Sequence, residues 1–230
     1  MQTLLEKCLF LLQCCCLSLP CRSSELDPSH LLAHFSQSLE TQKEVFLSNL
    51  PMLIKFIGLF WLVQVVNVLA GGRLRVLGIY PRHPIGLIGV VCSPFLHGDW
   101  NHLIVNSLML VVLASLLLVS GATVFWTVTG IIIIVSGLAV WFAGRESLHI
   151  GASSSVMGYW GFLLIQVYHH PNALTILIAA VCLYFFSGMF LNLVPGDKKV
   201  SWEGHVFGFV SGVLASYLYP WVISYFNIKL

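Results

Sequence analysis

Four side chains in this sequence have the types and spacing that acyl transfer needs. Ser153 offers a hydroxyl nucleophile, and His205 offers an imidazole that could take its proton as a general base. His102 and Asn106 offer two further hydrogen-bond donors for a developing oxyanion. Each residue lies near one end of a long apolar segment, so the set predicts a reactive site if the segments meet at that end.

His102 and Asn106 open one apolar segment and are four residues apart. On a helix this spacing places them one turn apart on the same face, with both donors directed the same way. Two interpretations are open for the pair. It could stabilise an oxyanion, or it could bond neighbouring helices, as polar side chains often do inside a membrane.

Ser153 lies in a segment of small residues that begins at Gly151 and ends at Gly158. Such residues allow another helix to approach closely. A serine in a membrane helix commonly just bonds the carbonyl four residues earlier. At a helix N-terminus it could instead act as a nucleophile, because unpaired backbone N–H groups there can hold an oxyanion.

His205 lies at the head of a strip of glycines that recur every four residues, namely Gly204, Gly208 and Gly212. The strip predicts a flat helix face for close packing. A single histidine here could be a bonded structural residue. Beside a tightly packed neighbour that carries a serine, it could reach the hydroxyl as a general base.

The apolar segments contain no Asp or Glu, so a third triad member is not expected within them. Glu203 stands close to His205 in sequence, but at a loop edge, and on a helix the two side chains point apart. The set therefore favours a serine–histidine dyad. The cysteines have no CxxC or Cys/His spacing typical of zinc, and neither a metal nor another cofactor is expected.

The composition indicates the class of protein that must position these residues. Of 230 residues, 58% are hydrophobic and only 9% are charged, with a formal net charge of +2. Soluble domains carry about 25% charged residues, so an ordinary soluble fold is excluded. A small net charge spread along the chain provides no basic face for nucleic acid. The sequence therefore predicts a protein that crosses a lipid bilayer several times.

The positions of the charges outline the membrane-spanning segments. Long charge-free stretches are divided by turn signals at Ser120-Gly121 and around Pro171. Each segment approaches the roughly 20 apolar residues that cross a membrane core about 30 Å thick. Runs such as residues 131–135 lack the alternation of a membrane β-barrel. The predicted fold is thus all-α and polytopic, with six spans at residues 52–70, 102–120, 124–143, 151–168, 173–194 and 203–223.

Residues 1–51 are expected to form an N-terminal extension before the membrane domain of residues 52–223, and residues 224–230 a short tail. The extension begins with an apolar run over residues 8–20, which could be an anchor, an upstream start or a cleaved signal peptide. Residues 24–50 could form an amphipathic helix that starts near Asp27-Pro28-Ser29.

The sequence resembles the rhomboid family of intramembrane serine proteases over residues 52–223. His102 and Asn106 match the family's HxxxN, and Gly151-Ala-Ser153 matches its GxSG, which places the nucleophile on Ser153. His205, with Gly208 and Gly212, matches its last motif. The segment that contains Tyr80-Pro81-Arg82 and residues 93–100 looks like a bacterial rhomboid's first loop.

The resemblance implies a serine endopeptidase that cuts membrane-anchored proteins in or near a transmembrane helix, and a location in the bacterial inner membrane. The family's glycine after the nucleophile is Ser154 here, and Met157 stands where many members carry an aromatic ring. His97, in the loop that enters the second span, is expected to be structural or to control access.

Two alternatives stay open at this stage. One is a catalytically silent rhomboid-like protein that binds membrane clients, although such relatives typically lack the serine or the histidine. The other is a small transporter or channel, which is disfavoured because the spans contain no carboxylate and no inverted repeat is visible.

Overall fold

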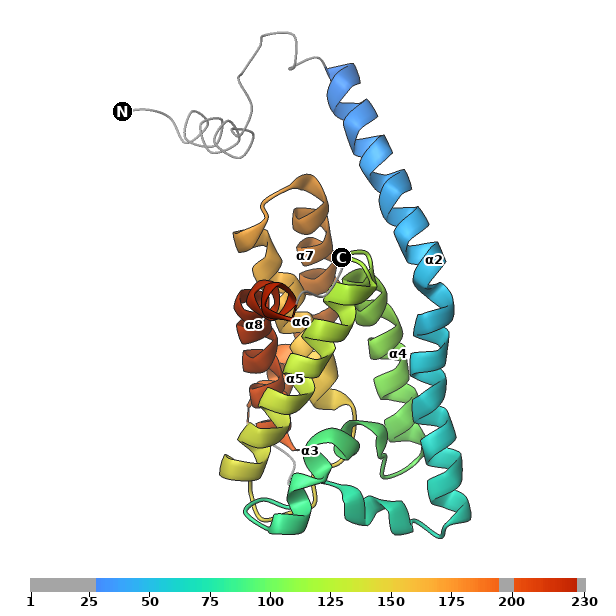
Figure 1. Cartoon of the computed structure of the whole chain (residues 1–230), viewed down its shortest axis with the longest axis vertical. Coiled ribbons are helices and arrows are strands. Elements are labelled where there is room, and N and C mark those ends of the chain that lie inside the picture. Colours follow the sequence, from blue (N-terminus) through green and yellow to red (C-terminus); the bar gives the residue numbers. More distant parts are fainter. Residues whose placement is uncertain (1–27, 195–200, 227–230) are drawn as a thin grey trace, which may run out of the picture.

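The computed structural model describes residues 28–194 and 201–226, and all of its named elements are helices (Figure 1). Six longer helices form a bundle, joined by short turns and by one long loop built from short helices. In chain order the elements are α2 (Pro28–Leu69), η1 (Arg73–Leu77), η2 (Pro84–Leu87), α3 (Gly89–Cys92), η3 (Ser93–Phe95), α4 (Trp100–Leu118), α5 (Ala122–Ala143), α6 (Ser153–His169), α7 (Ala173–Phe186), η4 (Ser187–Leu193) and α8 (Trp202–Tyr225).

Each predicted span corresponds to one of the six longer helices, with differences at the ends. The predicted span at 173–194 is α-helical only as far as Phe186 and continues as the 3-10 helix η4. Helix α2 runs without a break from Pro28 to Leu69 and passes through Pro51. The predicted amphipathic helix and the first span are therefore one helix, whose N-terminal part extends past the rest of the bundle (Figure 1). The apolar run at 8–20 lies outside the described residues.

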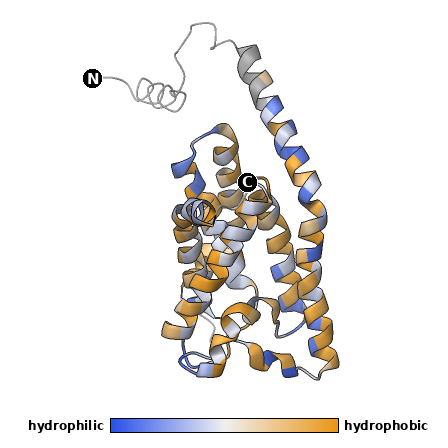
Figure 2. Ribbon diagram, viewed as in Figure 1, coloured by the Kyte–Doolittle hydropathy of each residue, from blue (hydrophilic) through white to orange (hydrophobic). Residues whose placement is uncertain are grey.

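Five of the described helices are long and apolar enough to cross a membrane, namely α2, α4, α5, the α7–η4 segment and α8. Helix α6 has 17 residues, which at a rise of about 1.5 Å per residue is slightly shorter than the membrane core. It packs against α4, α5, α7 and α8. Large apolar side chains such as Leu108, Phe142 and Trp221 are exposed. Hydrophobic residues make up most of the bundle's helices (Figure 2). The chain is an all-α polytopic membrane protein.

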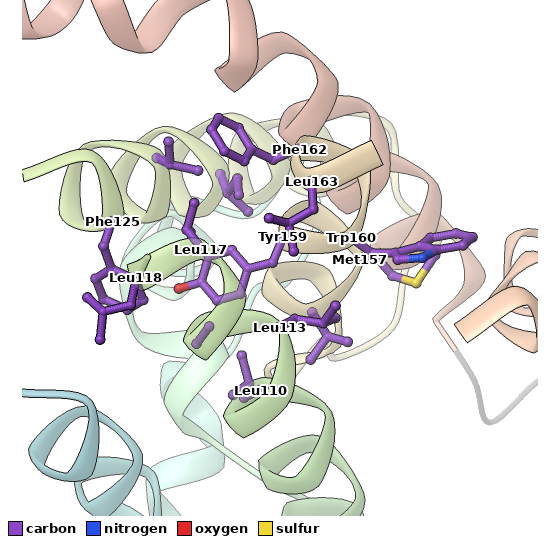
Figure 3. Packing of buried hydrophobic residues seen from close by; sticks show 14 of the residues in the cluster. Leu110, Leu113, Leu117, Leu118, Phe125, Met157, Tyr159, Trp160, Phe162 and Leu163 are labelled. Carbon is purple, nitrogen blue, oxygen red and sulfur yellow. The ribbon is translucent and has the colours of Figure 1, made fainter. Parts of the chain in front are cut away.

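The hydrophobic core is centred on α6. Tyr159, Trp160 and Phe162 are fully buried there. Tyr159 points toward leucines of α4 and toward Phe125 of α5 (Figure 3), whereas the Trp160 ring packs against Phe190 of η4 and Phe209 of α8. The phenolic oxygen of Tyr159 lies 2.8 Å from the hydroxyl of Thr129, so the one polar atom of this ring is satisfied inside the core. Burial on all sides holds α6 in a fixed position, and this helix begins at Ser153.

The long loop between α2 and α4 folds against the bundle at the end where α4, α6 and α8 begin (Figure 1). Close backbone contacts fix the loop. A Cβ at Gly89 would collide with the backbone of Gly78 and Ile79, so glycine is needed there. The backbones of Ile79 and His149 exchange two hydrogen bonds, of 3.0 and 2.9 Å, which tie this loop to the segment that leads into α6.

Candidate active site

The segment before α6 holds Ser153 at the first residue of the helix and Gly151 two residues earlier. Gly151 has φ +117°, a conformation that L side chains rarely adopt, and its N–H donates to the carbonyl of Ser93 at 2.9 Å. Because the first N–H groups of a helix have no partner within it, the backbone at Ser153 presents donors at this end of α6. Ser153 itself is partly exposed.

His102 and Asn106 face this segment from α4. A Cβ built on Gly151 would lie 2.6 and 2.7 Å from Cε1 and Nε2 of His102 and 3.7 Å from Nδ2 of Asn106. The Nδ2 atom of Asn106 is buried and has no hydrogen-bond partner in the described part of the chain. The two donors predicted to share one helix face therefore do share it, and that face is turned toward the backbone just before Ser153.

Helix α4 begins with a defined cap. Asp99 is the N-cap residue, and its Oδ1 accepts the backbone N–H of His102 at 2.8 Å. A side-chain cap of this kind typically stabilises a helix by about 1 kcal/mol. It fixes the first turn of α4, in which His102 lies.

Helix α8 brings His205 to the same end of the bundle by packing directly on α6. A Cβ at Gly208 would collide with the backbone of Ser154, and one at Gly212 with the backbone of Gly158. The second contact follows the first by one turn on both helices, so the helices run parallel with their N-termini together. His205 is buried one turn before Gly208. Ser153 is adjacent to Ser154.

The glycine strip predicted on α8 contributes two of its three members to this helix contact. Around Gly204, the nearest atoms are those of the Ser201 side chain, at 3.1 and 3.8 Å, rather than another helix. Gly158 of α6 has two close neighbours, since its backbone meets Gly212 and a Cβ there would lie 2.5 Å from the side chain of Ile132 in α5.

Glu203 is bound to an arginine that the sequence did not single out. Its carboxylate accepts hydrogen bonds from Nε and from a terminal nitrogen of Arg145, at 2.5 and 3.1 Å, and is almost fully buried. The carboxylate is therefore occupied with holding the start of α8 to the loop after α5.

His149 forms a second link between the two helix starts. Its Nε2 lies 2.9 Å from the carbonyl oxygen of Arg145, and its Nδ1 lies 2.6 Å from Oγ of Ser201. A carbonyl only accepts, so in the neutral ring Nε2 carries the proton and the Ser201 hydroxyl donates to Nδ1. Ser201 is the N-cap of α8 and accepts the N–H of Gly204 at 3.3 Å. No short-range pattern pointed to the contact between His149 and Ser201, because it joins residues 52 positions apart.

His97 lies beside His102 in the loop that enters α4. The two rings meet edge to face with centroids 5.1 Å apart, and neither ring nitrogen of His97 has a hydrogen-bond partner within residues 28–194 and 201–226. Burial, and after it the proximity of His102, lower the pKa of His97 from 6.5 to about 4. A neutral His97 thus packs against the ring of His102 and supports its position.

A small hollow lies beside Ser153, between the long loop and the starts of α6 and α8. Its polar lining consists of Ser93, Ser136, His149, Ser153, Ser154 and Ser201. Hydroxyl and imidazole groups in such a hollow can hold water near the serine. In the described ranges, 28–194 and 201–226, no three His, Cys, Asp or Glu side chains gather closely enough to hold a metal ion.

Comparison with known proteins identifies the family. The family described as the Rhomboid domain matches residues 85–221, which is more than half of the chain. The chain belongs to the rhomboid family. The matched rhomboid region includes α4, α5, α6 and α7 entirely and α8 as far as residue 221. It therefore contains His102, Asn106, Ser153 and His205.

This rhomboid is also similar to mycobacterial proteins. It is 37% identical to the uncharacterized proteins Rv1337 of Mycobacterium tuberculosis and Mb1372 of Mycobacterium bovis, over 72% of this chain and 73% of each relative. It is 32% identical to the uncharacterized protein ML1171 of Mycobacterium leprae, over 72% of this chain and 69% of that protein.

Proposed function

We propose that this rhomboid is an intramembrane serine endopeptidase with Ser153 as nucleophile and His205 as general base. The oxyanion would be held by the side chains of His102 and Asn106 together with the backbone N–H of Ser153. The observation that carries the proposal is the crowding at Gly151, where the missing side chain leaves space that the His102 ring and the Asn106 amide face. Two donors aimed at the backbone just before a serine are the arrangement that oxyanion stabilisation requires.

In the acylation half of the proposed reaction, His205 takes the proton of the Ser153 hydroxyl as its oxygen attacks the peptide carbonyl carbon. The carbonyl oxygen becomes negative and is stabilised by the backbone N–H of Ser153 and by the side chains of His102 and Asn106. His205 then gives its proton to the leaving amine nitrogen, the C–N bond breaks, and an ester of Ser153 forms.

In the deacylation half, His205 takes a proton from a water molecule whose oxygen attacks the ester carbon. The tetrahedral intermediate collapses, Ser153 recovers the proton from His205, and the carboxylic acid product leaves. The polar hollow beside Ser153 supports this step, because it offers hydroxyl partners for water at the edge of an apolar bundle. The reaction needs only side chains, backbone and water.

The proposed substrates are membrane-anchored proteins, cut in or near a transmembrane helix. A helix hides its carbonyl groups in its own hydrogen bonds, so the scissile stretch must unwind first. Small or helix-breaking residues at the cut site favour that step. The mycobacterial relatives support a bacterial membrane as the location, which we propose to be the inner membrane. Residues 52–223 are the proposed catalytic unit, and residues 1–51 are the proposed appended segment.

The proposal is tested by labelling the purified full-length protein with a fluorophosphonate, which reacts with activated serines. Labelling is expected for the wild type, and its loss is expected in Ser153→Ala and in His205→Ala. Ser154→Ala is the matched control, because it removes the adjacent hydroxyl and should keep the label. Labelling that persists in Ser153→Ala would exclude Ser153 as the nucleophile.

A catalytically silent protein that binds membrane clients is the competing function. The presence of both Ser153 and His205 in the matched rhomboid region favours the protease. A folded wild type that takes no label and cuts no model transmembrane substrate in proteoliposomes would favour the silent protein instead.

A further inference from the structure

A second cavity lies at the end of the bundle opposite Ser153. It has a volume of about 210 Å³ and is lined by the last turns of α4 and α6 and the first turns of α7, with Gln42 of α2 and Tyr219 of α8. A water molecule takes about 30 Å³ of liquid, so the cavity has room for a group of several heavy atoms. None of the proposed catalytic residues lines it.

Two acceptor atoms in this cavity lack a partner. The Oε1 atoms of Gln42 and Gln166 are both buried, and neither has a hydrogen-bond partner in the part of the chain that the structure describes. A buried polar atom left unpaired costs about 1–3 kcal/mol. A ligand that donates hydrogen bonds to both oxygens would remove that cost, so the missing partner is a donor.

The electrostatic setting favours a positive donor. Helix α4 ends at Leu118 and helix α6 at His169, and the residues directly after the two ends, Val119 and His170, line the cavity. The C-terminal end of a helix carries a partial negative charge that stabilises a nearby cation. The positive end of α7 is compensated by its own cap, in which Asn172 and Thr175 each accept the other's backbone N–H.

The rest of the lining points to an amphiphile. Leucine and isoleucine side chains from α4, α6 and α7 form the apolar part of the wall, and no Lys, Arg, Asp or Glu is among the lining residues that the structure describes. The turns that join the spans lie at this level, which is where lipid head groups meet the hydrocarbon core.

We propose that this cavity binds the primary ammonium head group of a membrane phospholipid, with Gln42 and Gln166 accepting its N–H groups. An ethanolamine head group has three such donors. A choline head group has the same charge but no N–H, so it cannot satisfy the two oxygens. Bound lipid would also connect the N-terminal part of α2, which carries Gln42, to α6 in the core.

The test compares lipids that differ only in the head group. Purified full-length protein in detergent is incubated with phosphatidylethanolamine or phosphatidylcholine of identical acyl chains, and retained lipid is counted by native mass spectrometry. At least fivefold greater retention of the ethanolamine lipid is expected, with a rise in Tm that the choline lipid does not give. Equal retention of the two lipids would overturn the proposal.

Variants assign the binding to the cavity. Gln42→Leu and Gln166→Leu are expected to abolish the preference, whereas Gln37→Leu, at an exposed position on the same helix α2, should keep it. Gln42→Glu adds a negative charge beside the ammonium group and should strengthen retention, so the idea stays testable even where a leucine variant folds poorly. A preference unchanged in both Gln42→Leu and Gln42→Glu would refute the assignment.

Soluble ethanolamine serves as the final arm, because it carries the same donors without acyl chains. If the ammonium group is what the cavity recognises, an excess of soluble ethanolamine should displace the ethanolamine lipid, and an excess of choline should not. Displacement by both amines alike would contradict recognition through N–H groups. Since Ser153→Ala leaves this cavity intact, the lipid result is independent of the proposed protease activity.

Discussion

The Nδ1 atom of His149 lies 2.6 Å from the Oγ atom of Ser201, and this hydrogen bond joins the segments that lead into α6 and α8. His149 is four residues before Ser153, and Ser201 is four residues before His205. The backbone of His149 is also paired with Ile79 of the long loop. One buried residue, through its side chain and its backbone, thus ties together the three chain segments that surround the proposed dyad.

Removing the His149 side chain should therefore affect activity more than stability. His149→Ala deletes the bonds to Ser201 and Arg145, at a cost of about 1–3 kcal/mol in the free energy of unfolding. The starts of α6 and α8 lose their link, so we expect the rate of fluorophosphonate labelling of Ser153 to fall about tenfold or more in protein that is still folded.

The control for this variant is His83→Ala, an exposed histidine of the long loop, which should label at the wild-type rate. Labelling is measured well below the Tm of each variant. If His149→Ala labels as fast as His83→Ala, the link does not align the dyad.

Gly151→Ala tests the proposed oxyanion site. The new Cβ would lie 2.6 Å from Cε1 of His102 at a backbone φ of +117°, so the variant combines a clash with backbone strain. Displacing one oxyanion donor typically costs about 100-fold or more in rate, and we expect a loss of that size in substrate turnover.

Gly121→Ala separates the clash from the strain. Gly121 also has a positive φ, +96°, but a Cβ there would meet nothing within 4 Å. We expect it to cost about 1–3 kcal/mol of stability and to keep its turnover. Equal turnover in the two variants would show that the space beside His102 is not needed for reaction.

Gly212→Ala and Gly130→Ala should shift stability in opposite directions. A Cβ at Gly212 would collide with the carbonyl of Gly158 and force α8 away from α6, at a cost of about 1–3 kcal/mol. At Gly130 of α5 a Cβ meets open space, so alanine should stabilise the helix by about 0.5–1 kcal/mol. Thermal unfolding in detergent measures both, and a Gly212→Ala variant as stable as the wild type would contradict the close packing.

The spans and the helix faces that carry the candidate site residues could be predicted because their signals are local. Missing charges over about 20 residues indicate a membrane helix whatever it packs against. The four-residue spacing of His102 and Asn106 fixes their common face, and the spacing of Gly208 and Gly212 fixes theirs. The parallel packing of α6 on α8 then follows from small residues that only a close neighbour can cover.

Two features that the sequence did not reveal are a contact between distant residues and the uninterrupted course of helix α2. Arg145 and Glu203 are 58 positions apart, and their pairing follows from how the loop after α5 folds over the start of α8. The sequence predicted a boundary after residue 51 between an extension and a first span, yet α2 continues through it and through Pro51. A proline removes one hydrogen-bond donor, and in a helix of 42 residues the flanking turns keep the axis continuous.

His97 makes the fold sensitive to acid. Burial lowers its pKa to about 4, whereas an unfolded histidine has a pKa near 6.5. Below about pH 6.5 the unfolded chain therefore binds a proton that the folded chain does not, and the free energy of unfolding falls as the pH drops from 6.5 toward 4. The contribution of neutral His97 to the free energy of unfolding is fully present above pH 6.5. Its total loss at low pH is on the order of 3 kcal/mol.

His97→Phe removes the titrating group and keeps a ring against His102, so its Tm should change less between pH 7 and pH 4.5 than that of the wild type. His83→Phe, which alters an exposed histidine of the same loop, should keep the wild-type dependence. A wild type whose Tm is constant over this range would mean that a charged His97 is accommodated in the fold. That result would contradict the structure, in which the buried His97 ring lies beside His102 and its nitrogens have no hydrogen-bond partner among the described residues.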